Sequence, residues 1–472
     1  MRPVLTLLAM TLAAAVAMPA VAADDTALLA ELKRLTQRVE ALEQQNKEME
    51  KSLTSERISE NEPEVITRLK AVEYQTLSIQ KQARQIEALE GISVGASLTG
   101  VVQKASEGNQ GTLANYRGDV AVALPGGEIG NTEGKIFAQL RFGQGDGVAL
   151  GGLGSRAYTS TPNTTAFQLA GGPADDSTVI LAQAWYQLAT PLLRDGTKAN
   201  AREHLHLTFG KIDPFVFFDQ NAAADDESVK FINNAFVHNP LLDSGGDIGA
   251  DTYGFAPGAI AQYVNEREKG SEWGLSLGVF GAGRGADFTG SLSSPLVIAQ
   301  AETAARLNYL PGNYRTYLWS NGRGAGYDGV ERRHSGIGFS ADQKVDDALT
   351  LFARYGHQID GKVRFDRALT VGGELGGSVW GRAADSLGVA VGALRTSADF
   401  RSDSPTLDAD GDGTPDFGYQ ASGWEQQLEL YYRYKVNKQF ELTPDFQLIR
   451  RPAGDGAGPT IKVIGLRAKI GF

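Results

Sequence analysis

The chain has 472 residues, a formal net charge of −11 and no cysteine. The negative charge argues against nucleic-acid binding, and the lack of cysteine excludes disulfides and thiolate metal sites. Glycine accounts for 57 residues, and no stretch of the chain reaches the roughly 20 apolar residues of a membrane-spanning helix. Two classes stay open, a soluble β protein and a transmembrane β-barrel, whose alternating hydropathy signal is weak.

Residues 1–22 have the pattern of a secretory signal peptide. Arg2 precedes an apolar run from Val4 to Met18, and the small residues Ala20 and Ala22 form an A-x-A cleavage site. We therefore expect an exported protein whose mature chain begins near Ala23. An uncleaved membrane anchor is the alternative.

Residues 24–90 follow a heptad pattern. Apolar residues from Leu28 to Leu53 are spaced four and three apart, with Asn46 at an a position, and a second seam follows an interruption at Pro63. Such a helix needs partner helices to bury its apolar stripe. We predict a periplasmic coiled coil that joins several copies of the chain. The alternative is an antiparallel hairpin that folds back at Pro63.

From residue 91 onward the hydrophobic period changes to two, the period of a β-strand. Short alternating stretches such as KIFAQLRFG, LTLFARYG and QLELYYRYKV are separated by clusters of Gly, Asp, Asn and Pro. We count 16 candidate strands over residues 91–472, and antiparallel outer-membrane barrels require an even number.

The pattern within single strands predicts one apolar and one polar face, as for Leu430 beside Glu429. A soluble β-sandwich would show the same alternation. Three features together favour a membrane barrel: the export signal, the lack of another way to close so many strands, and a final strand that ends on Phe472. In that strand Ile464 would face lipid and Arg467 a water-filled lumen.

Several stretches resemble the carbohydrate-selective porin (OprB-like) family of Gram-negative outer membranes. GKIDP and YYRYKVNKQFELTPDFQ are the most specific of them, and the similarity spans most of residues 91–472. The resemblance implies a 16-stranded barrel that passes sugars by diffusion through a constriction narrowed by inward loops. Residues 24–90 are an addition relative to shorter members. Phe472 resembles the terminal aromatic signal by which outer-membrane barrels are recognised for assembly.

Alternation also predicts which side chains line the lumen. A path for sugars needs charged and amide groups interleaved with aromatic rings, each contact being weak enough to release the solute. The alternative is that these charges pair with one another and brace the wall. The candidates are Arg141, Gln183, Trp185, Arg354, Glu429, Tyr431, Arg433, Arg467 and Lys469.

The segment from Asp213 to Asn239 lacks a strand period, and we expect it to fold into the lumen. An external, solvated loop is the alternative. Near the narrowest point the inward loop would place Asp219, Asn221, Asp225, Asp226 and Glu227.

The stretch DADGDGTPDFG is a candidate calcium loop. Asp408, Asp410, Asp412 and Asp416 match positions 1, 3, 5 and 9 of such a loop, but Tyr419 stands where an EF-hand needs a bidentate Glu. The pattern is closer to the aspartate-rich loops of thrombospondin type 3 repeats. We expect either millimolar-range Ca²⁺ binding outside the cell or a solvated acidic loop.

The sequence contains neither an H-E-x-x-H nor a G-x-S-x-G motif, so we expect no enzyme and no required cofactor. An outer-membrane lipase with a Ser–His pair is the enzymatic alternative. The function we predict is passive, carbohydrate-selective diffusion of small sugars across the outer membrane. Two further alternatives are a general or anion-preferring porin, and an envelope tether in which the barrel anchors a coiled coil that reaches toward peptidoglycan.

Overall fold

The computed structural model describes residues 92–107, 111–145, 147–148, 162–166, 177–193, 197–242, 254–283 and 290–472. The predicted signal peptide, residues 1–22, and the predicted coiled coil, residues 24–90, lie outside these described residues. Both segments and their boundaries stay predictions.

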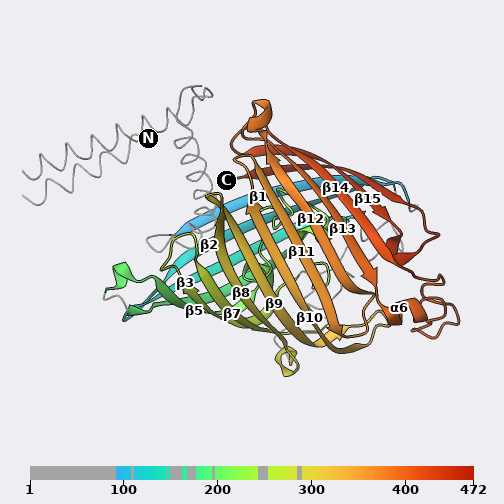
Figure 1. Ribbon diagram of the computed structural model, residues 1–472, viewed down its shortest axis with the longest axis horizontal. Coiled ribbons are helices and arrows are strands. Elements are labelled where there is room, and N and C mark those ends of the chain that lie inside the picture. Colours follow the sequence, from blue (N-terminus) through green and yellow to red (C-terminus); the bar gives the residue numbers. More distant parts are fainter. Residues whose placement is uncertain are drawn as a thin grey trace, which may run out of the picture. The chain divides into compact units, whose positions relative to one another are not determined.

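Sixteen strands, each antiparallel to its neighbours, form one sheet that closes on itself (Figure 1). The predicted all-β, antiparallel barrel and its number of strands are thereby confirmed. The closing pair is β1 with β16, aligned from Ser97↔Gly471 to Ala105↔Val463. The strands are β1 (Ser93–Ala105), β2 (Leu113–Ile129), β3 (Thr132–Gln144), β4 (Thr178–Pro191), β5 (Glu203–Ile212), β6 (Ala256–Asn265), β7 (Trp273–Phe280), β8 (Leu296–Leu307), β9 (Leu310–Ala325), β10 (Glu331–Lys344), β11 (Leu349–Asp360), β12 (Phe365–Gly376), β13 (Ser386–Thr396), β14 (Trp424–Lys435), β15 (Phe440–Arg450) and β16 (Ile461–Gly471).

The two faces of the wall follow the alternation in the sequence. In β16, Ile464 and Leu466 are 58% and 48% exposed on the outer face, whereas Val463 and Arg467 are buried on the inner face. Successive side chains of a strand point to opposite faces, so the face of one residue determines the face of every other residue in its strand. The outer face is therefore the apolar one.

The connections at the two ends of the barrel differ in length. At one end β2 and β3 are joined through Gly130, and β8 and β9 through Asn308 and Tyr309, both of which have positive φ. Two such residues in succession are typical of a type I′ turn, whose twist matches a tight hairpin. We call this the short-turn end, and the opposite one, which carries the connections from β5 to β6 and from β13 to β14, the loop end.

The described helices are short, and they lie in the connections between strands. None of those in the described ranges combines the length and the apolar character needed to cross a membrane. They are η3 (Lys198–Asn200), η4 (Pro214–Val216), α5 (Asn234–Val237), η5 (Ser291–Ser293), η6 (Gly377–Trp380), α6 (Ala398–Asp403) and η7 (Pro452–Gly454).

Candidate pore constriction

Residues 213–242, which we name the inward segment, follow β5 and pack against the inner face of the wall. The ring of Phe218 lies 6.0 Å from that of Phe280 on β7. Farther along, the ring of Phe231 lies 4.9 Å from that of Tyr431 on β14. All four side chains are buried. The segment and the wall thus share apolar clusters inside the barrel.

Local side-chain caps shape the inward segment. Asp213 accepts a hydrogen bond from the Phe215 backbone N–H at 3.0 Å, at the start of η4. Asn233 accepts one from Ala235 N–H at 3.0 Å, at the start of α5. Asx side chains in these positions satisfy the N–H groups that a helix end leaves unpaired. Since the segment is not a strand, its remaining backbone groups need partners on the wall.

A buried ion pair fixes the first half of the inward segment. Arg354 of β11 and Asp219 approach to 3.1 Å, and both side chains are fully buried. Arg354 also donates to the carbonyl oxygens of Ala224 and Phe236, each at 2.7 Å. Asp219 has a positive φ of 56°, which is unusual for a residue with a side chain. The ion pair and the carbonyl contacts together hold this conformation.

The Glu429 side chain on β14 fixes the second half of the inward segment. Glu429 accepts hydrogen bonds from the backbone N–H groups of Ile232, at 2.6 Å, and Asn233, at 3.0 Å. The Asn233 side chain donates to Gln447 of β15 at 3.1 Å. Glu429 and Gln447 are fully buried. Two neighbouring strands thereby bind the same turn of the inward segment.

The acidic stretch of the inward segment faces basic side chains of the wall. Glu227 pairs with Arg117 of β2 at 2.6 Å, and its carbonyl oxygen accepts a hydrogen bond from Arg467 of β16 at 2.8 Å. Lys469 donates to the Ser228 hydroxyl at 2.6 Å. The predicted residues Glu227, Arg467 and Lys469 are therefore brought together.

The other predicted residues of this stretch have different surroundings. Asn221 donates to the Ala341 carbonyl oxygen on β10 at 3.0 Å, and Asp226 accepts from the Ser228 N–H at 2.9 Å. Asp225 lies 3.9 Å from His238. Burial raises the pKa of Asp225 to about 7, although His238 works in the opposite direction.

A short piece of the connection between β3 and β4 reinforces the constriction. The Thr164 N–H donates to the Ile232 carbonyl oxygen at 3.0 Å. The Pro162 carbonyl oxygen accepts from Gln447 at 2.8 Å, and Asn163 donates to Asn115 of β2 at 2.8 Å. Nothing in the sequence singles these residues out, because the stretch TPNTT has neither charge nor a hydrophobic period.

The four remaining predicted lumen residues lie on the inner face of the wall. Arg141 of β3 pairs with Asp119 at 2.7 Å. Trp185 of β4 donates to Gln183 at 3.2 Å and stacks on Phe137. Arg433 of β14 is half-buried. Contact between any of these side chains and a passing solute stays a prediction.

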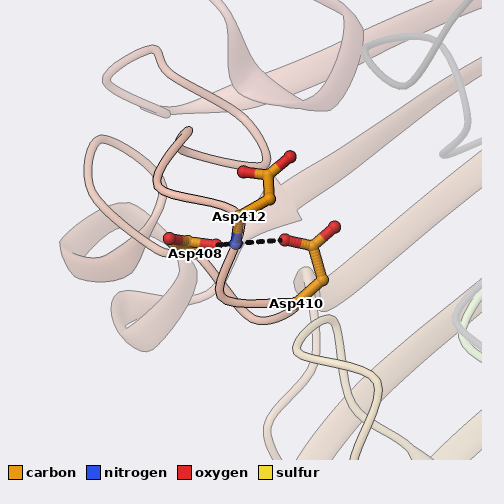
Figure 2. A group of neighbouring side chains, drawn as sticks. All are labelled: Asp408, Asp410 and Asp412. Atoms are coloured by element: carbon orange, nitrogen blue, oxygen red, sulfur yellow. Dashed lines mark hydrogen bonds between the residues drawn. The ribbon is translucent and has the colours of Figure 1, made fainter.

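The aspartate-rich stretch lies in the connection between β13 and β14 at the loop end. Asp408, Asp410 and Asp412 bring carboxylate oxygens within 4.8 Å of one another (Figure 2). Asp416 is outside this group, and it accepts a hydrogen bond from the Ala409 N–H. Hydrogen bonds from backbone N–H groups, the strongest from Gly413, lower the pKa of Asp408. The loop thus holds three hard oxygen donors, the ligand type that Ca²⁺ prefers.

Comparisons with known proteins agree with this architecture. The family profile described as carbohydrate-selective porin, OprB family, matches residues 23–472. The high-pH structure of Pseudomonas putida OprB is similar to this chain with a TM-score of 0.65 and 18% identity, over 81% of this chain and 94% of that one. A triple-mutant porin of Rhodopseudomonas blastica reaches a TM-score of 0.44 and 11% identity, over 81% of this chain and 100% of that one, a similarity too low to argue from. No curated protein matches the chain.

Proposed function

The chain belongs to the carbohydrate-selective porin family, and we propose that its inward segment is the element that selects small sugars. A channel of this family lies in the outer membrane of a Gram-negative bacterium and lets its solutes diffuse passively. One observation carries the proposal: the inward segment bridges opposite sides of the barrel. Glu227 binds Arg117 on β2, while Asp342 on β10, eight strands away in the closed sheet, accepts a hydrogen bond from the Ala222 N–H at 3.2 Å.

The charge pattern of the inner wall suits a neutral solute better than an anion. Arg117 and Arg141 share the carboxylate of Asp119, and Arg315 pairs with Asp342 at 3.2 Å. Paired charges present donors and acceptors side by side, and a sugar hydroxyl can use both. A general or anion-preferring pore would need arginines that are not neutralised by neighbours. We therefore place the sugar-selective function ahead of that alternative.

Liposome swelling with sugars of graded size tests the selective pore. We expect swelling rates that fall steeply with sugar size, and reversal potentials near zero in a salt gradient. Swelling that ignores sugar size would contradict selection by the inward segment. A strong anion-selective potential would support the general porin.

The coiled coil proposed for residues 24–90 would join copies of the chain or reach toward peptidoglycan. Its heptad spacing supports this proposal. A truncated chain without residues 24–90 should conduct normally but run as a smaller species in native electrophoresis. If the truncation loosens the envelope while the pore is unchanged, the tether function gains support.

We also propose that the loop containing Asp408, Asp410 and Asp412 binds Ca²⁺, with the affinity of roughly 10⁻⁴–10⁻³ M seen for extracellular modules. Titration calorimetry of the full chain should show heat on adding Ca²⁺, and Asp410→Asn should abolish it. Asp416→Asn serves as a matched control, because Asp416 lies outside the carboxylate group. Equal heats for the native chain and the Asp410 variant would reject the site.

A further inference from the structure

Basic side chains gather on the outer face of the wall at the loop end. His357 of β11 lies directly opposite Arg367 of β12, and Arg367 lies directly opposite Arg395 of β13. The three strands are neighbours in the sheet (Figure 1). Arg450 of β15 is exposed, and it faces β14 at Gln426, which in turn pairs with Ala393 of β13. We name His357, Arg367, Arg395 and Arg450 the outer basic patch.

Register and exposure place the outer basic patch on the lipid side rather than in the lumen. Tyr355, two residues before His357, is 39% exposed, and Leu369, two residues after Arg367, is 46% exposed. Residues two apart in a strand share a face. The pair Tyr355 and Leu369 belongs to the apolar outer surface, and His357, Arg367 and Arg395 form the next row toward the loop end. This row of basic side chains therefore lies at the boundary between the hydrocarbon core and the polar headgroups.

Within the described part of the chain, the patch has no counter-charge of its own. The side chains of Arg367 and Arg395 make no ion pair or hydrogen bond with a described residue, and the buried Arg367 Nε and His357 Nδ1 have no hydrogen-bond partner there. Asp366 is adjacent in the chain, but its buried Oδ1 has no hydrogen-bond partner among the described residues. Like charges directly opposite each other destabilise a sheet. The arrangement is therefore unfavourable until an anion lies between the two guanidinium groups.

The chemistry of the patch indicates what that anion is. A guanidinium group donates two parallel hydrogen bonds to a phosphate, and side chains opposite each other on paired strands start only about 5 Å apart. Trp424 of β14, directly opposite Arg395, is 39% exposed, and tryptophan favours the membrane interface. Long loops of such barrels face outward from the cell, so the patch meets the outer leaflet. In a Gram-negative outer membrane that leaflet consists of phosphorylated glycolipid.

We propose that the outer basic patch is a binding site for the phosphorylated headgroup of the outer-leaflet glycolipid. Arg367 and Arg395 hold one phosphate between them, and His357 lies beside Arg367. Arg450 lies two strands from Arg395, in the row of Tyr355 and Leu369, whose apolar side chains contact the acyl chains. The site lies on the wall outside the pore and serves binding to the membrane rather than solute passage.

Native mass spectrometry of the full-length, detergent-purified protein tests this proposal. The probes are diphosphoryl lipid A, the same lipid A without phosphates, and phosphatidylglycerol. We expect adducts with diphosphoryl lipid A, and the double variant Arg367→Ala/Arg395→Ala should weaken that binding about tenfold or more. Arg306→Ala is the matched control, since Arg306 is an exposed arginine at the short-turn end.

Several outcomes would overturn the proposal. They are equal binding of diphosphoryl lipid A by the double variant and the Arg306 control, equal binding of the lipid A without phosphates, and equal or tighter binding of phosphatidylglycerol. If the native chain forms a dimer and only the double variant fails to do so, the patch is an interface with a second copy of the chain instead.

Thermal unfolding separates binding from a merely structural role. In lipid-free detergent the double variant should be as stable as the native chain or more stable, because a like-charge pair is removed. Added diphosphoryl lipid A should raise the Tm of the native chain and leave that of the variant unchanged. If the double variant fails to fold, Arg395→Gln supplies the same comparison. Loss of stability by the variant in lipid-free detergent, with an unchanged response to lipid A, would reject the proposal.

Discussion

Leu430 and Glu429 are neighbours in β14, but their surroundings differ completely. Leu430 is 38% exposed on the outer face, where its only requirement is to be apolar. Glu429 is buried on the inner face and accepts two specific backbone hydrogen bonds from the inward segment. The outer face is thus specified by composition, whereas the inner face is specified by individual partners. Substitutions on the two faces should fail for different reasons.

Removing the buried cation of the inner face should have the largest effect. Arg354→Ala leaves Asp219 buried without its partner and removes the donors for two carbonyl oxygens, so we expect a loss of about 3–5 kcal/mol in the free energy of unfolding. The freed segment should also change single-channel conductance. Unfolding in urea and planar-bilayer recordings check both effects. Arg433→Ala, at a half-buried position of the wall, is the control for the loss of stability. An unchanged channel in Arg354→Ala would show that Arg354 does not hold the inward segment in place.

Placing a charge on the outer face should have the next largest effect. Leu430→Arg should cost roughly 2–4 kcal/mol if Leu430 lies near the bilayer midplane, because a cation is then exposed to hydrocarbon. Leu430→Phe is the matched control and should fold normally. Folding yield into lipid vesicles measures the difference. Normal yield for the Arg variant would mean that the outer face does not meet lipid there.

Changing one acceptor of the inner face should have a moderate effect. Glu429→Ala removes the partner of two buried N–H groups and should cost about 1–3 kcal/mol for each N–H left unsatisfied. Glu429→Gln keeps one acceptor oxygen and should cost less. Urea unfolding ranks the two variants. If both variants were as stable as the native chain, the backbone N–H groups at Ile232 would have other hydrogen-bond partners.

Deleting Phe472 should have the smallest effect on the pore itself. The backbone of Phe472 pairs with Ala96 of β1, and the residue is 84% exposed. We predict reduced insertion into the outer membrane, since the terminal aromatic residue would be an assembly signal, and unchanged conductance of the molecules that do insert. Phe472→Tyr, which keeps an aromatic ring, should restore insertion. If the chain without Phe472 inserted fully, Phe472 would not be an assembly signal.

The fold prediction rested on the alternation of apolar and polar residues within each strand. The parity of Ile464 and Arg467 in β16 is local information, and repeating it over sixteen strands indicates the barrel without any knowledge of distant contacts. The same parity places Arg354 on the inner face. It does not reveal that Arg354 binds Asp219, because that partner is 135 residues away in the chain.

The contacts of the constriction join residues that are far apart in the chain, and such contacts produce no periodic pattern in the sequence. Asn163 and Thr164 lie in a stretch without charge or alternation, yet they bind the wall and the inward segment. The cross-strand pair of Arg367 and Arg395 likewise requires the register, which single strands do not reveal. What could be predicted was the face of each side chain, and what could not was its partner.

The partners of the inward segment also determine when it can reach its final place. The segment follows β5, but Glu429, Gln447 and Arg467 belong to the last three strands of the chain. The full set of these contacts requires β14, β15 and β16 all to be in position. The lumen is therefore not complete before the last three strands are in place, and the pairing of β16 with β1 is long-range in sequence. A barrel closed in the wrong register would misplace these three side chains, so the seated segment serves as a check on correct assembly.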